Sequence, residues 1–462
     1  MAQVSAKGSF NLMWGLVAST VISAVGTIYV ANLLSPEEYG LYALAVAAPT
    51  LISVFRDWGV NSALIKYTAQ YNSEKQLERT KKILSAGLVF EVGVGLLLTV
   101  VSFLLSSFFA GLYQHSALTP LIQVASFTIL VNALFTVAQS AFIGFERMEL
   151  NSVTAIVQSI IKAIFTPLLV ILGFGVFGAA LGYTLSFSVA GVLGALILWV
   201  LYRKLPKSSA HFTSQSESKM VTFSEIKENA RHLLKYGFPL QIGAIISAFQ
   251  TQFYVILMGI FVATEAVGNY SLATTFIVLV TFFASPITTT LFPAFSKLEA
   301  QKDEEALKSV FKFSVKYASL LVVPVVAIVM ALAQPGISTL FGNKYASAPL
   351  FLALLALSYS FTAFGSLSVT NFINGQGKTV FNLKLNALSA TIGFPLGTFL
   401  VWQFGVVGIL VAMIVAGIPS LAISLIWVKK HYNLSIDWGA RTEIKLDVFD
   451  QLSHLKIVFL YN

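Results

Sequence analysis

The sequence predicts an all-α membrane protein with about twelve transmembrane helices, arranged as two six-helix lobes related by pseudo-two-fold symmetry. Three observations lead to this prediction. The 462-residue chain is 56% hydrophobic and only 11% charged, with a mean hydropathy of +0.81, whereas soluble domains carry about 25% charged residues. Its basic residues fall into alternate loops, and short motifs recur at similar places in its two halves.

The apolar stretches have the length needed to cross a hydrocarbon core of about 30 Å as a helix, which is about 20 residues. Because the membrane interior offers no water, each span must satisfy its own backbone hydrogen bonds, and this favours helices. In chain order we expect spans at residues 10–33, 39–55, 83–109, 118–140, 153–172, 176–201, 236–262, 268–291, 313–333, 349–369, 380–402 and 406–428.

The lysines and arginines predict the topology. All but two of the 29 lie before the first span, in loops that follow an even-numbered span, or within five residues of the start of the span after such a loop; the exceptions are Lys162, deep inside a span, and Lys344. Basic loops stay in the cytoplasm, so both termini are expected there, in a multi-pass protein of the plasma or inner membrane. The same rule accounts for the net charge of +9 without a nucleic-acid partner.

Four regions follow from this pattern. We expect an amino-terminal six-helix lobe over residues 1–202, a cytoplasmic linker over 203–235, a carboxy-terminal six-helix lobe over 236–428 and a cytoplasmic tail over 429–462. The linker is the longest hydrophilic stretch between spans and is rich in serine and lysine, a composition typical of a flexible connection.

An internal repeat supports the division into lobes. Residues 40–45 read Gly-Leu-Tyr-Ala-Leu-Ala and open the second span, while residues 268–273 read Gly-Asn-Tyr-Ser-Leu-Ala and open the eighth. Residues 142–144 and 372–375 match in the same way after the fourth and tenth spans. Six spans per copy keep the two copies in the same orientation, as in transporters built from parallel repeats, whose substrate site lies between the repeats.

Several motifs together resemble those of a known family. Residues 233–240 (Leu-Leu-Lys-Tyr-Gly-Phe-Pro-Leu) lead into the seventh span, residues 34–40 (Leu-Ser-Pro-Glu-Glu-Tyr-Gly) precede the second, and residues 57–59 (Asp-Trp-Gly) follow it. The chain resembles the Wzx-type polysaccharide biosynthesis flippases of the MOP superfamily, which also holds MATE drug exporters and lipid II flippases. The resemblance implies two lobes around a central cavity, alternating access, and passage of a lipid-linked oligosaccharide from the inner to the outer leaflet.

Two ionisable residues lie well inside predicted spans. Glu91 is roughly 12 Å deep in the third span and Lys162 roughly 14 Å deep in the fifth. A charge at mid-helix costs about 2.5–3.5 kcal/mol, so such residues face the protein interior or a wet cavity. Three interpretations stay open: a Glu91–Lys162 ion pair inside one lobe, Lys162 in the cavity attracting the phosphates of a polyprenyl carrier, and Glu91 carrying H⁺ or coordinating Na⁺ as the coupling ion.

Buried amides give further candidates for substrate binding. Gln250 and Gln252 lie on the seventh span, and Gln139 and Asn132 on the fourth. With Lys162 they are our predicted sugar- and phosphate-binding residues, although amides in membrane helices also serve simply as interhelical hydrogen bonds. Asp57, beside Arg56 at the end of the second span, suggests an interfacial ion pair.

The motif search favours a transporter over an enzyme. The chain has no cysteine, no phosphate-binding GxxxxGK[ST] loop and no HExxH, so we expect no cofactor, no metal and no catalytic residue. Short neutral loops on the non-cytoplasmic side argue against a membrane glycosyltransferase. Two other rivals are a scaffold for glycan assembly and a MATE-like ion-coupled exporter of small organic molecules. The expected partners are a lipid-linked oligosaccharide, membrane lipids, H⁺ or Na⁺, and glycan-assembly proteins.

Overall fold

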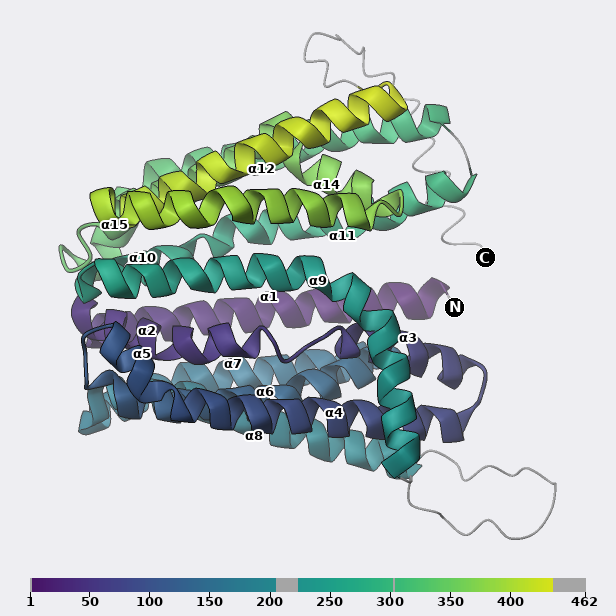
Figure 1. Ribbon diagram of the computed structural model, residues 1–462, viewed down its shortest axis with the longest axis horizontal. Coiled ribbons are helices and arrows are strands. Elements are labelled where there is room, and N and C mark those ends of the chain that lie inside the picture. Colours follow the sequence, from purple (N-terminus) through teal and green to yellow (C-terminus); the bar gives the residue numbers. More distant parts are fainter. Residues whose placement is uncertain (1, 205–222, 302–303, 435–462) are drawn as a thin grey trace.

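Every element described in the computed structural model is helical (Figure 1). The structure describes residues 2–204, 223–301 and 304–434. The α-helices are α1 (Ala2–Leu33), α2 (Pro36–Ser53), α3 (Val60–Ser73), α4 (Leu77–Leu104), α5 (Ser106–Leu112), α6 (Leu118–Gly144), α7 (Met148–Leu169), α8 (Gly175–Lys204), α9 (Phe223–Phe261), α10 (Thr264–Phe276), α11 (Val278–Gln301), α12 (Glu304–Phe341), α13 (Ala348–Tyr359), α14 (Ser366–Gly375) and α15 (Thr379–Tyr432).

The lengths of these helices confirm a polytopic membrane protein. Within the described residues, eight helical segments are long and apolar enough to cross a membrane, or nine if the bent pair α13 and α14 counts as one span. Two of the eight are far too long for one crossing. The α15 segment has 54 residues, which would extend about 80 Å if straight.

Glycines with positive φ divide the two overlong segments. In α15 the chain reverses at Gly405 (φ 58°), and a Cβ at Gly408 would overlap the carbonyl oxygen of Leu400. Between α7 and α8 a π-helical turn (Val170–Phe174) holds Gly173 at φ 93°, and Gly175 follows at φ 51°. Only glycine adopts such backbone angles at little cost. Each segment therefore provides two crossings, which gives up to eleven, and with α2 at the predicted second span the arrangement is consistent with twelve.

Two of the predicted spans are broken rather than straight. The span expected at residues 268–291 is divided between α10 and α11. The span expected at 349–369 bends by 60° at Gly365, which has a φ of 76° and follows a 3₁₀ turn (Ser360–Phe364). Broken helices lend themselves to binding sites and hinges in transporters.

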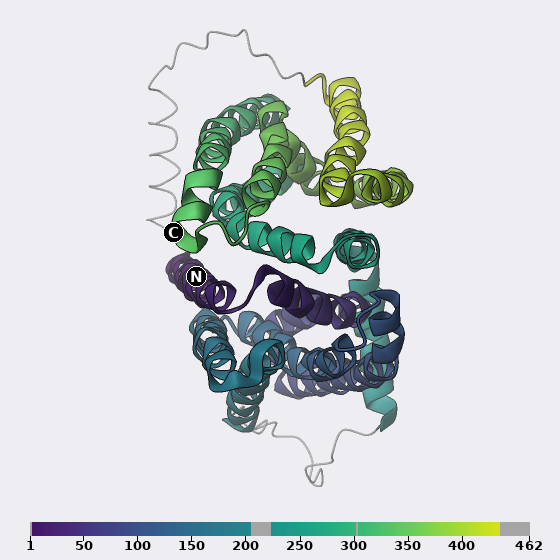
Figure 2. The same ribbon diagram turned by 90° about the vertical axis from the view of Figure 1, so that its left-hand side faces the viewer.

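The helices form two groups, α1–α8 and α9–α15 (Figure 2). In the first group α1 packs on α7 and α6 packs on α8, while in the second α9 packs on α15 and α11 on α12. The main contacts between the groups join α2 to α10, and α9 to α4, α2 and α3. This arrangement agrees with the expected pair of lobes.

The two ends of the molecule differ in charge. One end, on the right in Figure 1, carries α3, the starts of α4 and α9, and the ends of α8 and α15. We call it the basic end, because it holds many of the lysines and arginines outside the spans, among them Lys66, Arg79, Arg203, Arg231 and Lys429. The opposite end, where α2 and α10 begin, is the far end.

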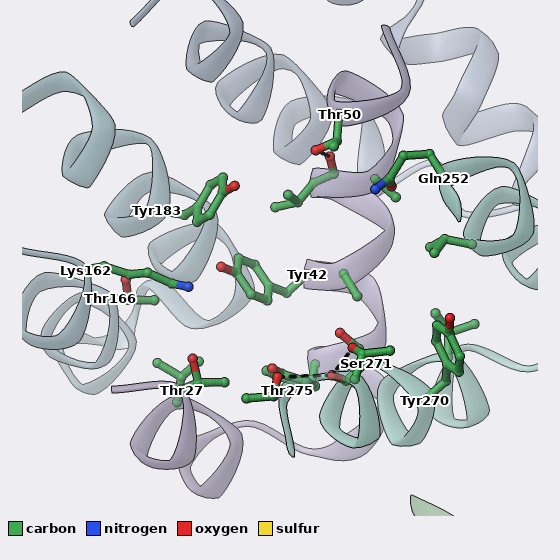
Figure 3. Close-up of a pocket in the computed structure, with 18 of the residues that line it drawn as sticks. Thr27, Tyr42, Thr50, Lys162, Thr166, Tyr183, Gln252, Tyr270, Ser271 and Thr275 are labelled. Atoms are coloured by element: carbon green, nitrogen blue, oxygen red, sulfur yellow. Dashed lines mark hydrogen bonds between the residues drawn. The ribbon is translucent and has the colours of Figure 1, made fainter. Parts of the chain in front are cut away.

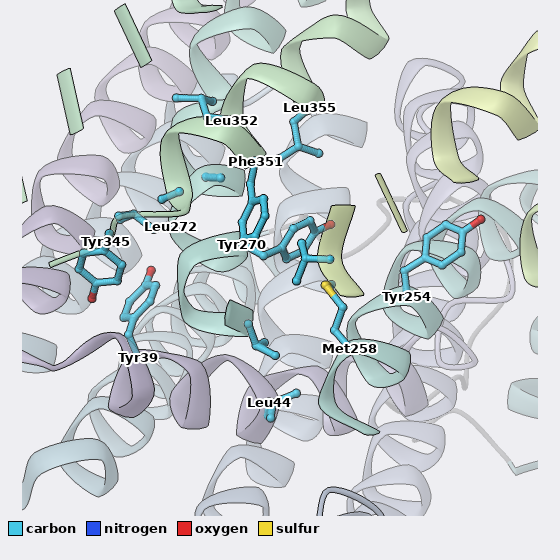
Figure 4. Packing of buried hydrophobic residues seen from close by; sticks show 14 of the residues in the cluster. Tyr39, Leu44, Tyr254, Met258, Tyr270, Leu272, Tyr345, Phe351, Leu352 and Leu355 are labelled. Atoms are coloured by element: carbon cyan, nitrogen blue, oxygen red, sulfur yellow. The ribbon is translucent and has the colours of Figure 1, made fainter. Parts of the chain in front are cut away.

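The hydrophobic cores show where the two groups are joined. One core spans both groups and includes Leu44 of α2, Leu272 of α10 and Phe351 of α13 (Figure 4). Toward the basic end each group has a core of its own, around Leu64 in the first and around Phe311 in the second. The groups thus share one core toward the far end, whereas toward the basic end only the first part of α9 joins the core of the other group.

The prediction of a flexible linker over residues 203–235 does not hold for its last part. Residues 205–222 lie outside the described residues, but 223–235 form the first part of α9. This part crosses the ends of α3 and α4 (Figure 1) and buries Leu233 in the core of the first group. The composition suggested a linker because the exposed face of this helix is charged. Its other face packs on the first group and holds the helix in place.

Candidate functional site in a central cavity

A cavity of about 390 Å³ lies between the two groups of helices (Figure 3). Residues from α1, α2, α7, α8, α9 and α10 line it, so both groups contribute to its wall. The lining is rich in hydroxyl groups, and Lys162 is its only charged side chain among the described residues. The polar lining residues are Thr27, Tyr39, Tyr42, Thr50, Lys162, Thr166, Tyr183, Thr251, Gln252, Tyr270, Ser271, Thr274 and Thr275.

Close packing of α1 against α7 positions Lys162. A Cβ at Gly26 of α1 would overlap the backbone of Ala163, so a small residue is needed there for the two helices to touch. The Lys162 ammonium lies 3.4 Å from the Ser23 hydroxyl and 5.6 Å from the centre of the Tyr183 ring. No carboxylate within the described residues forms an ion pair with it. Lys162 therefore reaches the cavity without a carboxylate partner among the described residues.

Two tyrosines lie near Lys162. Tyr42 and Tyr183 meet edge to face, with ring centroids 6.3 Å apart, and in Figure 3 the hydroxyl group of Tyr42 points toward Lys162. Aromatic faces and hydroxyl groups together suit a ligand that has both apolar and polar faces, such as a sugar ring. Neither tyrosine was predicted from the sequence to be a site residue. The internal repeat could have pointed to Tyr42, because Tyr42 and Tyr270 occupy equivalent positions in its two copies.

The predicted amides divide between the cavity and the protein interior. Gln252 lines the central cavity and also an adjoining cavity of about 460 Å³, which extends toward the basic end past Asp57 and Gln241. Gln250 lies two positions away, on the other face of α9, and donates to the Tyr254 hydroxyl at 2.9 Å.

The amides of α6 do not face the cavity either. Neither Gln139 nor Asn132 is among the residues that line the central or the adjoining cavity. Their backbone carbonyls accept hydrogen bonds from Asn151 and Thr136. Because α6 is covered by α2, α4 and α8, its polar side chains lie among helices of the first group. Substrate binding by these two residues stays a prediction.

The predicted Glu91–Lys162 ion pair is wrong. Glu91, which is fully buried, instead pairs with Arg56, whose Nη1 also donates to the Thr136 hydroxyl at 3.0 Å. Asn61 donates to the second Glu91 oxygen at 3.3 Å. The turn after α2 brings Arg56 into the first group, while α7 directs Lys162 to the cavity.

The expected pairing of Asp57 with Arg56 fails for the same reason. Asp57 instead accepts a hydrogen bond from the backbone N–H of Gly59 at 2.9 Å. Arg56 is only 6% exposed and turns away from the membrane surface toward Glu91. Asp57 therefore shapes the turn between α2 and α3.

Two glycines close the cavity at the far end. A Cβ at Gly40 of α2 would overlap the carbonyl oxygen of Thr264, and a Cβ at Gly268 of α10 would overlap that of Pro36. The contact is symmetric, since Gly40 and Gly268 are equivalent in the repeat and each meets the residue four positions before the other. Such reciprocity is what a two-fold axis produces at a contact between two copies.

Hydrogen bonds between the groups reinforce this closure. The Tyr345 hydroxyl donates to the carbonyl of Ala31 at 2.9 Å, and the Lys344 ammonium donates to the carbonyl of Asn32 at 2.8 Å. Within the second group, the Asn269 side chain accepts from the backbone N–H of Ala348 at 3.0 Å and joins α10 to the start of α13. The far end is thus sealed by backbone contact, aromatic packing and polar contacts together.

Two helix groups around a polar cavity that is sealed at one end have the architecture of an alternating-access membrane transporter. The fold is similar to that of an inward-facing multidrug resistance MATE transporter of the MOP superfamily, with a TM-score of 0.70, 16% identity, and 90% and 94% of the two chains covered. It is equally similar to the lipid II flippase MurJ in an inward closed conformation, with a TM-score of 0.70, 17% identity and coverages of 90% and 87%.

The chain belongs to the polysaccharide biosynthesis protein family, whose model matches residues 5–299. The lipopolysaccharide biosynthesis protein WzxC of Escherichia coli K12 is 22% identical over 386 residues, which are 83% of this chain and 73% of that protein. The lipid II flippase MurJ of Bacillus subtilis is 21% identical over 456 residues, 93% of this chain and 83% of that protein. These findings confirm the predicted family.

Proposed function

We propose that this protein is a flippase that moves a polyprenyl-(di)phosphate-linked oligosaccharide from the cytoplasmic to the outer leaflet by alternating access, for the synthesis of a surface polysaccharide or glycan. The unpaired Lys162 in a cavity lined by hydroxyl and tyrosine side chains carries this proposal. The ammonium attracts the phosphate of the carrier, and the hydroxyls and rings contact the sugars. The names of the relatives, a lipopolysaccharide biosynthesis protein and a lipid II flippase, support the same substrate class.

The orientation follows from the charge pattern. Lysines and arginines gather at the basic end, so we place that end and both termini in the cytoplasm. The seal at Gly40 and Gly268 then faces outward, and the structure corresponds to an inward-facing or inward-closed state. The TM-score of 0.70 to an inward-facing MATE transporter, against 0.58 to an outward-facing one, supports this assignment.

The alternative of a MATE-like exporter of organic cations is not favoured. Such a site needs acidic residues, whereas the lining of the central cavity contains a cation and no carboxylate among the described residues. Glu91, the one deeply buried carboxylate in the part of the chain that the structure describes, already pairs with Arg56. Coupling to H⁺ or Na⁺ through Glu91 would require this pair to separate, and it stays a prediction, as does association with glycan-assembly proteins.

The test is to deplete the protein in its native host and to quantify polyprenyl-linked oligosaccharides in the membrane by mass spectrometry. We expect the complete lipid-linked glycan to accumulate while the surface polymer is lost. Complementation with Lys162→Gln should fail to clear it, with export reduced about tenfold or more because a charge-assisted contact is removed. Lys162→Arg should restore part of the export.

The matched control is Lys312→Gln, which removes an exposed lysine of α12. It should leave export unchanged at the same protein level. Lipid-linked pools that do not change on depletion would contradict the flippase assignment. Normal export by Lys162→Gln would contradict the role of the cavity lysine alone.

A further inference from the structure

A second and larger cavity, of about 1050 Å³, opens at the basic end. It lies between the ends of α3 and α4 and the first part of α9, which crosses them (Figure 1). None of its lining residues lines the central cavity. We call it the basic-end cavity.

Positive charge dominates this cavity. Arg79 and Lys82 of α4 face Arg231 and Lys235 of α9 across it, with Glu225 and Glu228 as the acidic lining residues. The Lys82 ammonium already binds Glu225 at 2.7 Å. Arg79, Arg231 and Lys235 form no ion pair with any residue that the structure describes, so the cavity keeps a net positive charge.

The cavity is built on firmly packed elements. Leu233 buries the opposite face of the first part of α9 in the core of the first group. The His232 ring lies 4.5 Å from that of Tyr67, and the Lys66 ammonium lies 3.8 Å above the Tyr236 ring. These contacts hold Arg231 and Lys235 at fixed positions relative to α4, so their charges converge on one space.

An aromatic stack and a close backbone contact between Gly59 and Gly237 lie between this cavity and the route to the central one. Trp58 and Phe238 both line the basic-end cavity, and their rings stack with centroids 5.5 Å apart. The neighbouring Asp57 and Gln241 already line the adjoining cavity, which shares Gln252 with the central cavity. The three cavities therefore form a series from the basic end to Lys162.

We infer that the basic-end cavity binds the phosphate headgroup of a lipid in the leaflet on that side, and that the polyprenyl-phosphate carrier docks there before its headgroup passes Trp58 and Phe238. The guanidinium groups of Arg79 and Arg231 bind phosphate oxygens in a fork geometry that a lysine cannot reproduce. Identification of the ligand as the carrier rests on the proposed function; the phosphate site itself rests on the cavity and its charges.

The simplest rival is that these charges only set topology. Topology depends on the number of basic residues in a loop and not on the cavity that they line. A matched pair of double variants separates the two ideas. Arg79→Gln/Arg231→Gln removes one charge from α4 and one from α9 inside the cavity, whereas Lys75→Gln/Lys227→Gln removes one charge just before α4 and one from α9 outside it.

The experiment measures binding of undecaprenyl diphosphate to the purified full-length protein by native mass spectrometry, with phosphatidylglycerol as a parallel probe. We expect Arg79→Gln/Arg231→Gln to bind undecaprenyl diphosphate about thirtyfold more weakly, and Lys75→Gln/Lys227→Gln to bind it as the unaltered protein does. Phosphatidylglycerol should bind all three proteins alike.

Each other outcome overturns part of the inference. Equal loss in both double variants means that only overall charge matters and removes the phosphate site. Loss of phosphatidylglycerol binding alone means that the cavity holds a membrane phospholipid and overturns docking of the carrier. Failure of the unaltered protein to bind undecaprenyl diphosphate contradicts the proposed function itself, whereas normal binding by Arg79→Gln/Arg231→Gln contradicts only this inference.

Discussion

The two ends of the molecule join the helix groups in different ways. At the far end one hydrophobic core spans both groups, and the backbones of α2 and α10 touch at Gly40 and Gly268. At the basic end the backbones touch at Gly59 and Gly237, but most of each group packs in a core of its own, and a buried ion pair, Arg56–Glu91, stabilises the first group from within. A transporter that opens at one end needs this asymmetry, because each group must stay intact when the contact between groups is absent.

The largest effect is expected from breaking the pair that stabilises the first group alone. Glu91→Ala leaves Arg56 buried without a counter-charge, a change that costs about 3–5 kcal/mol. We expect a large fall in the thermal unfolding temperature of the purified protein. Arg56→Met/Glu91→Leu, which removes both charges and keeps the volume, should recover most of the loss.

The same variants test whether the pair has a second role. If the double variant is as stable as the unaltered protein and still exports glycan, the pair is structural. If it is stable but inactive, Glu91 takes part in transport, as the coupling-ion interpretation requires. A single variant with unchanged stability would show that the charges are not buried as the structure places them.

An intermediate effect is expected from breaking the seal between the groups. Gly40→Ala inserts a methyl group where the Thr264 carbonyl lies, and such overpacking costs about 1–3 kcal/mol. We expect the outward-open state to gain about tenfold in population and export to fall. The chain has no cysteine, so Thr275→Cys places a single thiol in the cavity. Its reaction with a membrane-impermeant thiol reagent measures how far the cavity is open to the outside.

Labelling of Thr275→Cys from outside should rise about tenfold when Gly40→Ala is added. Gly93→Ala on α4 is the matched control, because a Cβ there meets nothing within 4 Å. Equal labelling of the two glycine variants would show that the contact of α2 with α10 does not close the cavity.

The smallest effect is expected from a single hydrogen bond across the seal. Tyr345→Phe removes the hydroxyl that donates to the Ala31 carbonyl, at a cost of about 1 kcal/mol. We expect labelling of Thr275→Cys from outside to rise about fivefold, with protein stability almost unchanged. Tyr317→Phe, which alters an exposed ring of α12, should have no effect. If labelling rises by a similar factor in both tyrosine variants, the hydrogen bond from Tyr345 to Ala31 does not contribute to the seal.

Several features of this protein could be read from the sequence because they depend on local composition. Hydropathy and segment length predicted a helical membrane protein, and the distribution of basic residues predicted the charged end. The motif repeated at residues 40–45 and 268–273 marked the two glycines that meet and the tyrosines Tyr42 and Tyr270 that line the cavity. Lys162 was a site candidate because an isolated charge in a span needs a polar surrounding.

Partners and facing directions were decided only by the tertiary structure. Glu91 could have paired with Lys162 by depth alone, yet the turn after α2 supplies Arg56 instead. Gln252 faces the cavity and Gln250 does not, because the rotation of α9 determines which of them points inward. Inside a membrane, helices pair through the fit of small residues and interhelical contacts and not through a hydrophobic gradient. Such contacts join residues far apart in the chain, so no local pattern reveals them.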